Sequence, residues 1–271
     1  MIRVGVDPPW CCDKEFKEGL KSMKIAICGK GGVGKSTIGA LIIQALLEKG
    51  RRVLAIDADP SPHLARLLGL DLGDITPIAA MKELLQERSE RNGPFYNMNP
   101  RVGDLPEKFM KKRGALSLMV LGAIVQGGAG CACAENAVLR NLLNCLLLAK
   151  QEDVVLDMEA GVEHLGRGTI ASVDHIIIVV QPYRGSIETA GKIESLARDL
   201  KIRSLHVVAN NIQDESDVEF ISQMCGVEPV GVFESSKKAR DAERQGLPVA
   251  SADSKLVEAA NKMIERLEPT L

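Results

Sequence analysis

The chain has 271 residues, 45% hydrophobic and 26% charged, which is the composition of a soluble globular protein. Its formal net charge of -2 gives no global argument for a nucleic-acid partner, and no apolar run approaches the roughly 20 residues of a membrane span. We therefore expect the protein to bind neither nucleic acid nor a membrane. Prolines and charged residues interrupt the N-terminus, so it does not read as a signal peptide and we expect a cytoplasmic protein. Seven cysteines, an odd number, argue against a disulfide framework and leave metal or redox roles open.

Apolar runs separated by helical patterns follow one another along the chain. Strands are expected at 23–28, 53–56, 116–121, 154–156, 175–180, 205–209 and 229–232. Helices are expected at 36–49, 78–90, 134–150, 186–200 and 255–267. Alternating strands and helices predict an α/β fold: a doubly wound, mostly parallel sheet flanked by helices.

The limits of the domain follow from the first strand. Residues 23–271 are interpreted as a single domain, and residues 1–22 as an N-terminal extension, with Met23 as an alternative native start. Glycines and prolines concentrate between 71 and 115, which predicts an insertion or a mobile segment.

A glycine-rich loop follows the first strand and matches the P-loop pattern G-x-x-x-x-G-K-[ST]. Its residues are Gly29, Lys30, Gly31, Gly32, Val33, Gly34, Lys35, Ser36 and Thr37. Glycines let backbone N–H groups turn inward toward phosphate oxygens, and the following helix offers its positive N-terminus. We expect Lys35 to pair with the β- and γ-phosphates of ATP and the Ser36 hydroxyl to coordinate Mg²⁺.

Lys30, directly after the first loop glycine, makes this loop resemble the deviant Walker A group, which includes the MinD and ParA ATPases and the nitrogenase iron protein. The resemblance implies that Lys30 reaches across an ATP-dependent homodimer to the partner's nucleotide. A cation there would act in catalysis as an arginine finger does.

Polar residues at other strand ends complete the predicted site. Asp157 ends a strand and fits a Walker B aspartate that holds Mg²⁺. The resemblance implies that Asp59 orients the attacking water, that the Gly161 N–H senses the γ-phosphate, and that Asn210 reads adenine. Asp57 precedes Asp59, and the alternative is that both aspartates only cap the turn before a helix.

Cys131 and Cys133 form a C-x-C pair before a predicted helix. Two thiolates fill only half of a tetrahedral site, so a two-fold dimer would supply four. The alternative is a pair of small buried cysteines that pack at a helix start.

Two segments resemble the CooC-type nickel-insertion ATPases, which mature carbon monoxide dehydrogenase. They are 128–136, which contains the cysteine pair, and 157–168. The resemblance implies a slow Mg²⁺-dependent ATP hydrolase and metallochaperone that binds Ni²⁺, or Zn²⁺, through Cys131 and Cys133 at the dimer interface. Its client would be carbon monoxide dehydrogenase. Alternatives are an iron–sulfur reductase of the nitrogenase iron-protein type and a MinD/ParA-like positioning ATPase.

Overall fold

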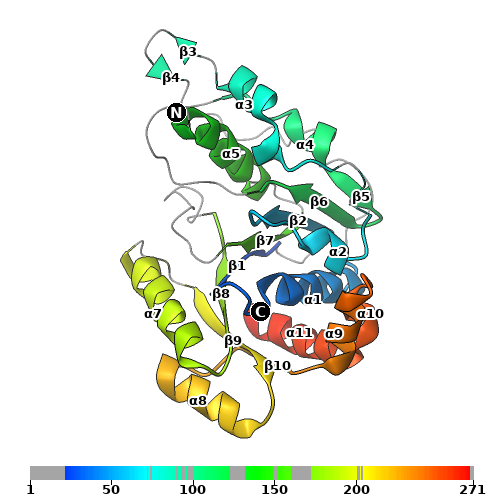
Figure 1. The fold of residues 1–271 in the computed structure, drawn as a ribbon, viewed down its shortest axis with the longest axis vertical. Helices are drawn as coiled ribbons and strands as arrows, with labels where there is room; N and C mark the ends of the chain where they lie inside the picture. Colours follow the sequence, from blue (N-terminus) through cyan, green and yellow to red (C-terminus); the bar gives the residue numbers. More distant parts are fainter. Residues whose placement is uncertain are drawn as a thin grey trace.

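The computed structural model describes residues 22–71, 73, 75–89, 91–92, 95–96, 100–122, 132–148, 152–159, 172–199, 202 and 204–268. Within these ranges the main sheet has eight strands, in the order β10-β9-β8-β1-β7-β2-β6-β5 (Figure 1). Their bounds are β1 Lys24–Cys28, β2 Val53–Ala58, β5 Lys111–Arg113, β6 Leu116–Val120, β7 Asp153–Met158, β8 His175–Val180, β9 Leu205–Ile212 and β10 Gly231–Glu234. A separate pair consists of β3 Arg91–Asn92 and β4 Phe95–Tyr96.

The predicted doubly wound parallel sheet is confirmed. All neighbouring strands from β10 to β6 run parallel, and β5 at the edge pairs antiparallel with β6. The central strands are buried along almost their whole length because helices cover the sheet on both faces.

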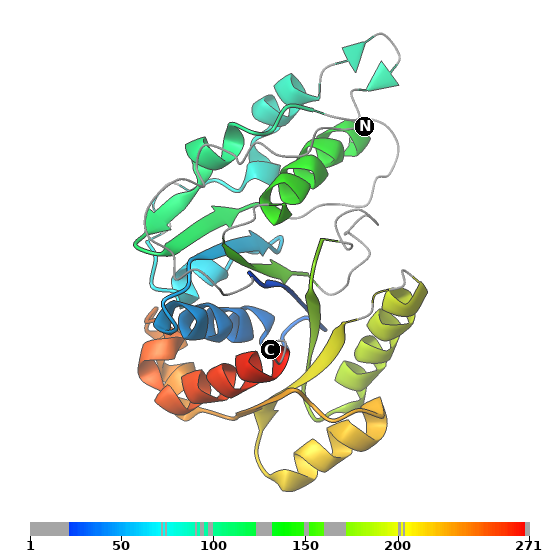
Figure 2. The ribbon, with the colours of Figure 1, turned by 180° about the vertical axis from the view of Figure 1, so that it is seen from behind.

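Helices divide between the two faces of the sheet (Figures 1 and 2). Their bounds are α1 Lys35–Glu48, α2 Leu64–Leu67, the 3₁₀ helix η2 Ile78–Ala80, α3 Lys82–Arg88, α4 Leu105–Phe109, α5 Ala132–Leu147, α7 Arg184–Asp199, α8 Glu215–Cys225, α9 Lys237–Arg244, α10 Val249–Ala252 and α11 Ser254–Leu267. One hydrophobic cluster joins α1, α2, α10 and α11 to the sheet, and the other joins α3, α4, α5, α7 and α8.

The described residues of the stretch 71–115, which was predicted to be an insertion or a mobile segment, include several elements of secondary structure. The stretch contains η2, α3, α4 and β5, and it buries Ile78, Leu85 and Leu105 in the core. The expected helix at 78–90 corresponds to η2 and α3, whereas α4 and β5, which are too short to show a periodic pattern, were not predicted. The last expected strand also begins later than predicted, at Gly231, because Pro229 has no N–H to donate to a neighbouring strand.

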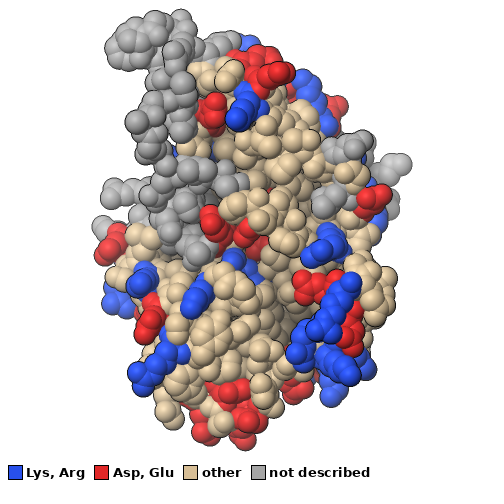
Figure 3. Space-filling view, in the orientation of Figure 1, with Lys and Arg blue, Asp and Glu red and all other residues tan. Residues whose placement is uncertain are grey.

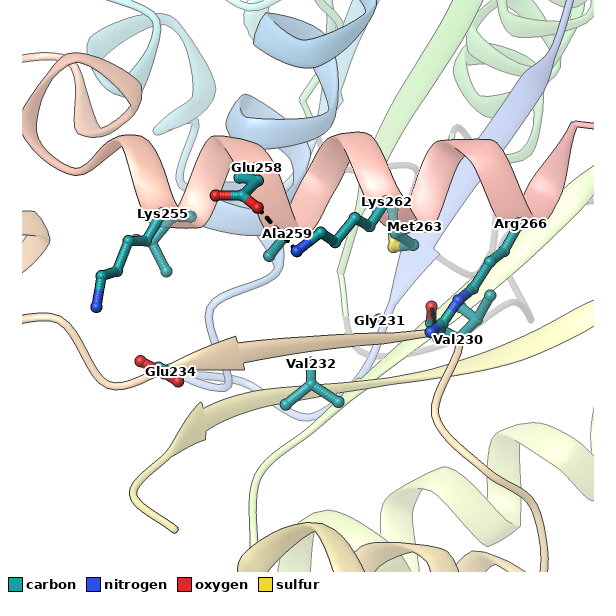
Figure 4. Close-up of a pocket in the computed structure, with 11 residues that line it drawn as sticks. Val230, Gly231, Val232, Glu234, Lys255, Glu258, Ala259, Lys262, Met263 and Arg266 are labelled. Atoms are coloured by element: carbon teal, nitrogen blue, oxygen red, sulfur yellow. Dashed lines mark hydrogen bonds and ion pairs between the residues drawn. The ribbon is translucent and has the colours of Figure 1, made fainter. Parts of the chain in front are cut away.

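Helix α11 lies along the edge strand β10 and runs opposite to it (Figure 4). Met263 faces Gly231, where a Cβ atom would come within 3.0 Å of the Met263 side chain, so glycine permits this close approach. The Arg266 guanidinium donates to the Val230 carbonyl at 3.1 Å. The apolar residues of α11 are buried in the cluster that this helix shares with α1 and the sheet: Leu256, Val257, Ala260, Met263, Ile264 and Leu267.

A buried ion pair ties the end of α11 to the amino-terminal edge of the sheet. Arg51 pairs with Asp153 through two nitrogens, and Asp153 also accepts the Met23 backbone N–H at 2.7 Å. Arg51 reaches Glu268 at 2.8 Å. The side chains of Arg51 and Asp153 are only 6% and 3% exposed, so each charge depends on the other for compensation.

Charges of both signs share the surface in Figure 3. Basic and acidic side chains intermix around α9 and α10, and acidic ones gather over α8, which carries Glu215 and Asp217 in its first turn. Among the helices that the structure describes, none is both long and apolar enough to span a bilayer.

Candidate functional site

The glycine loop from Gly29 to Gly34 joins β1 to α1 at the carboxyl-terminal edge of the sheet. Gly29, Gly32 and Gly34 have φ angles of 142°, 81° and 92°. A Cβ atom at Gly29 would lie 2.5 Å from the Val179 carbonyl oxygen of β8. The loop therefore requires glycine at Gly29 both for its dihedral angle and for its contact with β8.

Two side-chain amides hold the loop from outside. Asn210 on β9 donates through Nδ2 to the Val33 carbonyl at 2.7 Å, and Gln181 after β8 donates to the same oxygen at 3.2 Å. A Cβ atom at Gly34 would come within 2.4 Å of the Asn210 amide nitrogen. Asn210 thus fixes the loop in this structure, and its contact with adenine stays a prediction.

Gln181 is a residue that the sequence analysis missed. Its signal was available, because it is a polar residue directly after the apolar strand His175–Val180. Such residues meet the loop wherever parallel strands end at one edge of the sheet.

Helix α1 opens onto the loop. It begins at Lys35 with Gly34 in a left-handed conformation and with no side-chain cap, so its first N–H groups can serve an anion. Lys35 is only 7% exposed, Ser36 and Thr37 are half-buried, and Gly31 and Gly32 lie exposed at the loop surface. This is the arrangement that phosphate binding requires.

Two buried aspartates lie side by side next to this loop. Asp57 of β2 and Asp157 of β7 are register partners in adjacent parallel strands, and both are fully buried. Asp57 accepts the backbone N–H groups of Asp59 at 3.2 Å and Leu64 at 3.0 Å. Burial nevertheless raises the pKa of Asp57. The two hydrogen bonds let Asp57 cap the turn into α2.

Asp157 has no comparable support. In the described part of the chain neither of its carboxylate oxygens accepts a hydrogen bond of normal geometry. Burial raises the pKa of Asp157 to about 7; the Ser36 hydroxyl and the Lys35 charge oppose this rise, and the Asp57 and Asp59 carboxylates add to it. A buried carboxylate that lacks partners needs a cation, and its oxygens together with the Ser36 hydroxyl are the ligands that Mg²⁺ prefers. The residues present therefore fit a magnesium ion.

Asp59 lies half-buried just beyond β2. Its carboxylate accepts the Ser61 backbone N–H at 2.9 Å, which orders the turn ahead of α2. This position at the carboxyl edge is compatible with a water-orienting role, which stays a prediction.

Lys30 turns toward the start of α7 in the same chain. Its ammonium nitrogen lies 5.5 Å from the centre of the Tyr183 ring, over the ring face. A Cβ atom at Gly185 would come within 2.6 Å of that nitrogen. Tyr183 and Gly185 together form the surface against which Lys30 packs.

The remaining predicted site residues are Gly161, Cys131 and Cys133, and the structure describes none of their side chains. Gly161 and Cys131 lie outside the described residues. Cys133 belongs by its backbone to the first turn of α5, and its side chain lies outside the description. Their roles stay predictions.

Comparison with known proteins agrees with this geometry. Residues 24–249 match the family described as CobQ/CobB/MinD/ParA nucleotide binding domain. The carbon monoxide dehydrogenase accessory protein CooC of Rhodospirillum rubrum is 46% identical over 205 residues, covering 73% of this chain and 78% of the relative. An uncharacterized ATP-binding protein of Methanocaldococcus jannaschii is 38% identical over 252 residues, covering 90% of this chain and 96% of the relative.

A solved structure shows the same fold. A chain of the MinC:MinD cell division protein complex from Aquifex aeolicus superposes with a TM-score of 0.66 at 25% identity, covering 92% of this chain and 98% of that one. The glycine loop, the buried aspartates and these similarities agree on a nucleotide-binding protein. The chain belongs to the CobQ/CobB/MinD/ParA nucleotide binding domain family, as a CooC-type P-loop ATPase.

Proposed function

We propose that the chain is an ATP-dependent, dimerising metallochaperone that binds nickel through Cys131 and Cys133 and delivers it to carbon monoxide dehydrogenase in the cytoplasm. The observation that carries this proposal is the 46% identity with the CooC accessory protein, in a chain that also has the C-x-C pair. The nucleotide site supplies the energy source for such a cycle.

Nucleotide binding rests on the loop and the start of α1. The phosphates of ATP would lie against the backbone N–H groups of the loop, with the Lys35 ammonium beside the β- and γ-phosphates. Ser36 and Asp157 would hold Mg²⁺, which neutralises negative charge on the phosphate oxygens. This contact would also compensate the buried Asp157 carboxylate, so nucleotide and metal should bind together.

Dimerisation rests on Lys30. In the described structure its ammonium lies against Tyr183 of the same chain, half-buried at the rim of the loop. In a closed dimer we propose that Lys30 leaves this surface and reaches the γ-phosphate in the partner subunit. Positive charge that arrives there with the second subunit would stabilise the transferring phosphoryl group.

Hydrolysis needs a water molecule in line with the bond between the γ-phosphorus and the bridging oxygen. We propose that Asp59 orients this water. The water oxygen bonds to phosphorus as the bond to the ADP oxygen breaks, which yields ADP and phosphate, and the proton of the water passes to solvent with the phosphate. Loss of the γ-phosphate would then remove the contact that the Gly161 N–H makes with it, and the dimer would open.

Metal binding rests on Cys133, in the first turn of α5, and on Cys131, two residues earlier in the sequence. One pair supplies two thiolates, and a two-fold dimer supplies the four that a soft or borderline ion favours. We propose that ATP-driven closure brings the pairs together around one Ni²⁺, and that hydrolysis separates them so that the ion passes to the client enzyme.

Metal analysis and oligomeric mass, measured with and without ATP, test this proposal. The expected result is one Ni²⁺ per dimer with ATP, lost in Cys131→Ala and Cys133→Ala while both variants still bind ATP. Cys145→Ala is the matched control on the same helix. Cys145 packs against the core and burial raises the pKa of its thiol, so its loss should leave nickel binding unchanged. Unchanged nickel binding in the Cys131 and Cys133 variants would refute the metal site.

The same samples separate the alternatives. An iron–sulfur reductase purified without oxygen would be brown and would contain iron and sulfide. A positioning ATPase of the MinD type would sediment with lipid vesicles in ATP. The apolar face of α11 is buried against the sheet, which argues against that helix as a membrane anchor.

A further inference from the structure

Three polar groups converge at the amino-terminal edge of the sheet, at the opposite end of the strands from the nucleotide site. His175 Nδ1 lies 2.9 Å from Ser204 Oγ and 3.2 Å from His206 Nε2. Ser204 Oγ lies 2.9 Å from His206 Nε2. Two ring nitrogens and one hydroxyl oxygen thus form a triangle, which we call the His175–Ser204–His206 cluster.

Strand pairing explains why these side chains meet. His175 begins β8, His206 is the second residue of β9, and these strands pair in parallel with Ile177 opposite His206. Alternation along each strand places both imidazoles on the face of the sheet that α1 and α11 cover. All three residues of the cluster are half-buried, so an ion could reach them from solvent.

Hydrogen bonds can link all three groups: one imidazole N–H donates to the Ser204 hydroxyl, and that hydroxyl donates to the nitrogen of the other imidazole. Each imidazole N–H lies in the plane of its ring and points in one direction, so it serves one of its two neighbours. The serine hydroxyl likewise supplies one proton for two contacts. With Ser204 bridging the two rings in this way, no proton is directed between His175 Nδ1 and His206 Nε2, which lie 3.2 Å apart.

A metal ion fits the same geometry. Metal–nitrogen bonds of about 2.0–2.1 Å place neighbouring ligands about 2.9 Å apart at right angles and about 3.4 Å apart at the tetrahedral angle. The three edges of the cluster, 2.9, 2.9 and 3.2 Å, fall within this span. The spacing of the three atoms is therefore compatible with one ion bound between them as well as with hydrogen bonds, and water would complete the coordination of such an ion.

The electrostatic setting favours neutral imidazole, which is the form that binds metal. Burial lowers the pKa of His206, and the neighbouring His175 lowers it further. The nearest carboxylate in sequence, Asp174, accepts the Lys24 backbone N–H at 2.9 Å. Burial also lowers the pKa of Lys24, and Asp174 opposes this change.

We propose that His175, Ser204 and His206 bind a divalent transition-metal ion of borderline softness, such as Ni²⁺ or Zn²⁺. Imidazole nitrogens suit these ions. Within the described part of the chain no group of three His, Cys, Asp or Glu side chains has metal-binding spacing, so the cluster has two strong ligands rather than three or four. An ion bound at such a site exchanges with solution rather than stabilising the fold, and its binding does not depend on Cys131 and Cys133.

Isothermal titration of the tag-free, full-length Cys131→Ser/Cys133→Ser variant with Ni²⁺ at pH 7.5, without nucleotide, tests the site. The expected result is one ion per protomer, bound at least about tenfold more weakly in His175→Gln and in His206→Gln, a loss of about 1.4 kcal/mol. His63→Gln is the matched control, because His63 lies exposed near Ser61 on another part of the chain, and it should bind like the parent.

Nitrogen-detected NMR of the parent with Zn²⁺ needs no histidine variant, so misfolding of a variant cannot explain its result. His175 Nδ1 and His206 Nε2 should both shift on saturation, and the shifts should be lost when acid protonates both imidazoles. A parent that binds no ion, or histidine variants that bind Ni²⁺ like the parent, would overturn the proposal and leave a hydrogen-bonded histidine pair.

Discussion

The ammonium of Lys30 lies 5.5 Å from the ring centre of Tyr183, within one chain. The lysine that is proposed to act on a partner's nucleotide is therefore held at the start of its own α7. A cation over an aromatic face is stabilised by about 0.5–1 kcal/mol at exposed sites. Closure of a dimer would have to break this contact.

Tyr183→Ala should promote ATP-dependent dimerisation, because Lys30 no longer has to leave an aromatic surface. The ATP concentration at half-dimerisation should fall roughly two- to fivefold, which corresponds to the energy of such a contact. Light scattering after size exclusion, across an ATP titration, measures this.

Tyr183→Phe is the matched control, because it keeps the ring face and should behave like the parent. Lys30→Ala should fail to dimerise in every background. If Tyr183→Ala dimerises like the parent while Lys30→Ala does not, the Tyr183 contact has no part in controlling closure.

Asp157→Asn should stabilise the protein without nucleotide and abolish Mg²⁺-dependent ATP binding. Because the folded pKa of about 7 lies above the ordinary value of 3.8, the native state holds a proton that the unfolded state has lost between these pH values. Stability of the parent should therefore fall as pH rises through this window, by on the order of 2–4 kcal/mol in total.

Urea unfolding at pH 5 and pH 8 measures this difference. The contribution of Asp157 to the pH dependence should be absent in the asparagine variant, which has no proton to lose. If the unfolding free energies of the parent and Asp157→Asn changed equally with pH across this window, the raised pKa of Asp157 would be contradicted.

Gly29→Ala should destabilise the protein without nucleotide by at least ~2 kcal/mol, since Gly29 has a φ of 142° and faces the Val179 carbonyl at close range. Gly31→Ala is the control in the same loop. Gly31 has no neighbour within 4 Å of an added Cβ, so its unfolding free energy should change by less than about 0.5 kcal/mol. Denaturant melts of both variants test the contrast, and equal losses would contradict it.

Asp153→Asn should cost about 3 kcal/mol or more of unfolding free energy, because it leaves the buried Arg51 guanidinium without its main counter-charge. Glu268 also contacts Arg51, but its side chain is 30% exposed, so Glu268→Gln should cost less than about 1 kcal/mol. Chemical denaturation of the two variants measures both losses of unfolding free energy. A larger loss in Glu268→Gln than in Asp153→Asn would contradict the prediction.

Much of the fold could be predicted from local patterns. The boundaries of α1 and α11 came within a residue or two, because glycine at position 50 adopts the expected left-handed conformation and apolar periodicity marks the buried face. Short helices such as α2, α9 and α10 were missed. They have too few residues for a periodic pattern, and tertiary packing rather than intrinsic propensity stabilises them.

By itself, the sequence determined the phosphate loop, the parallel sheet and the aspartates at its carboxyl edge. These features depend on the order of residues along single strands and turns, where spacing alone fixes geometry. Only the tertiary structure decided that Asn210 and Gln181 hold Val33, that Lys30 lies on Tyr183, and that His175 meets His206. Each of these pairs joins segments far apart in the chain, and their contact depends on strand order and register, which no local pattern encodes.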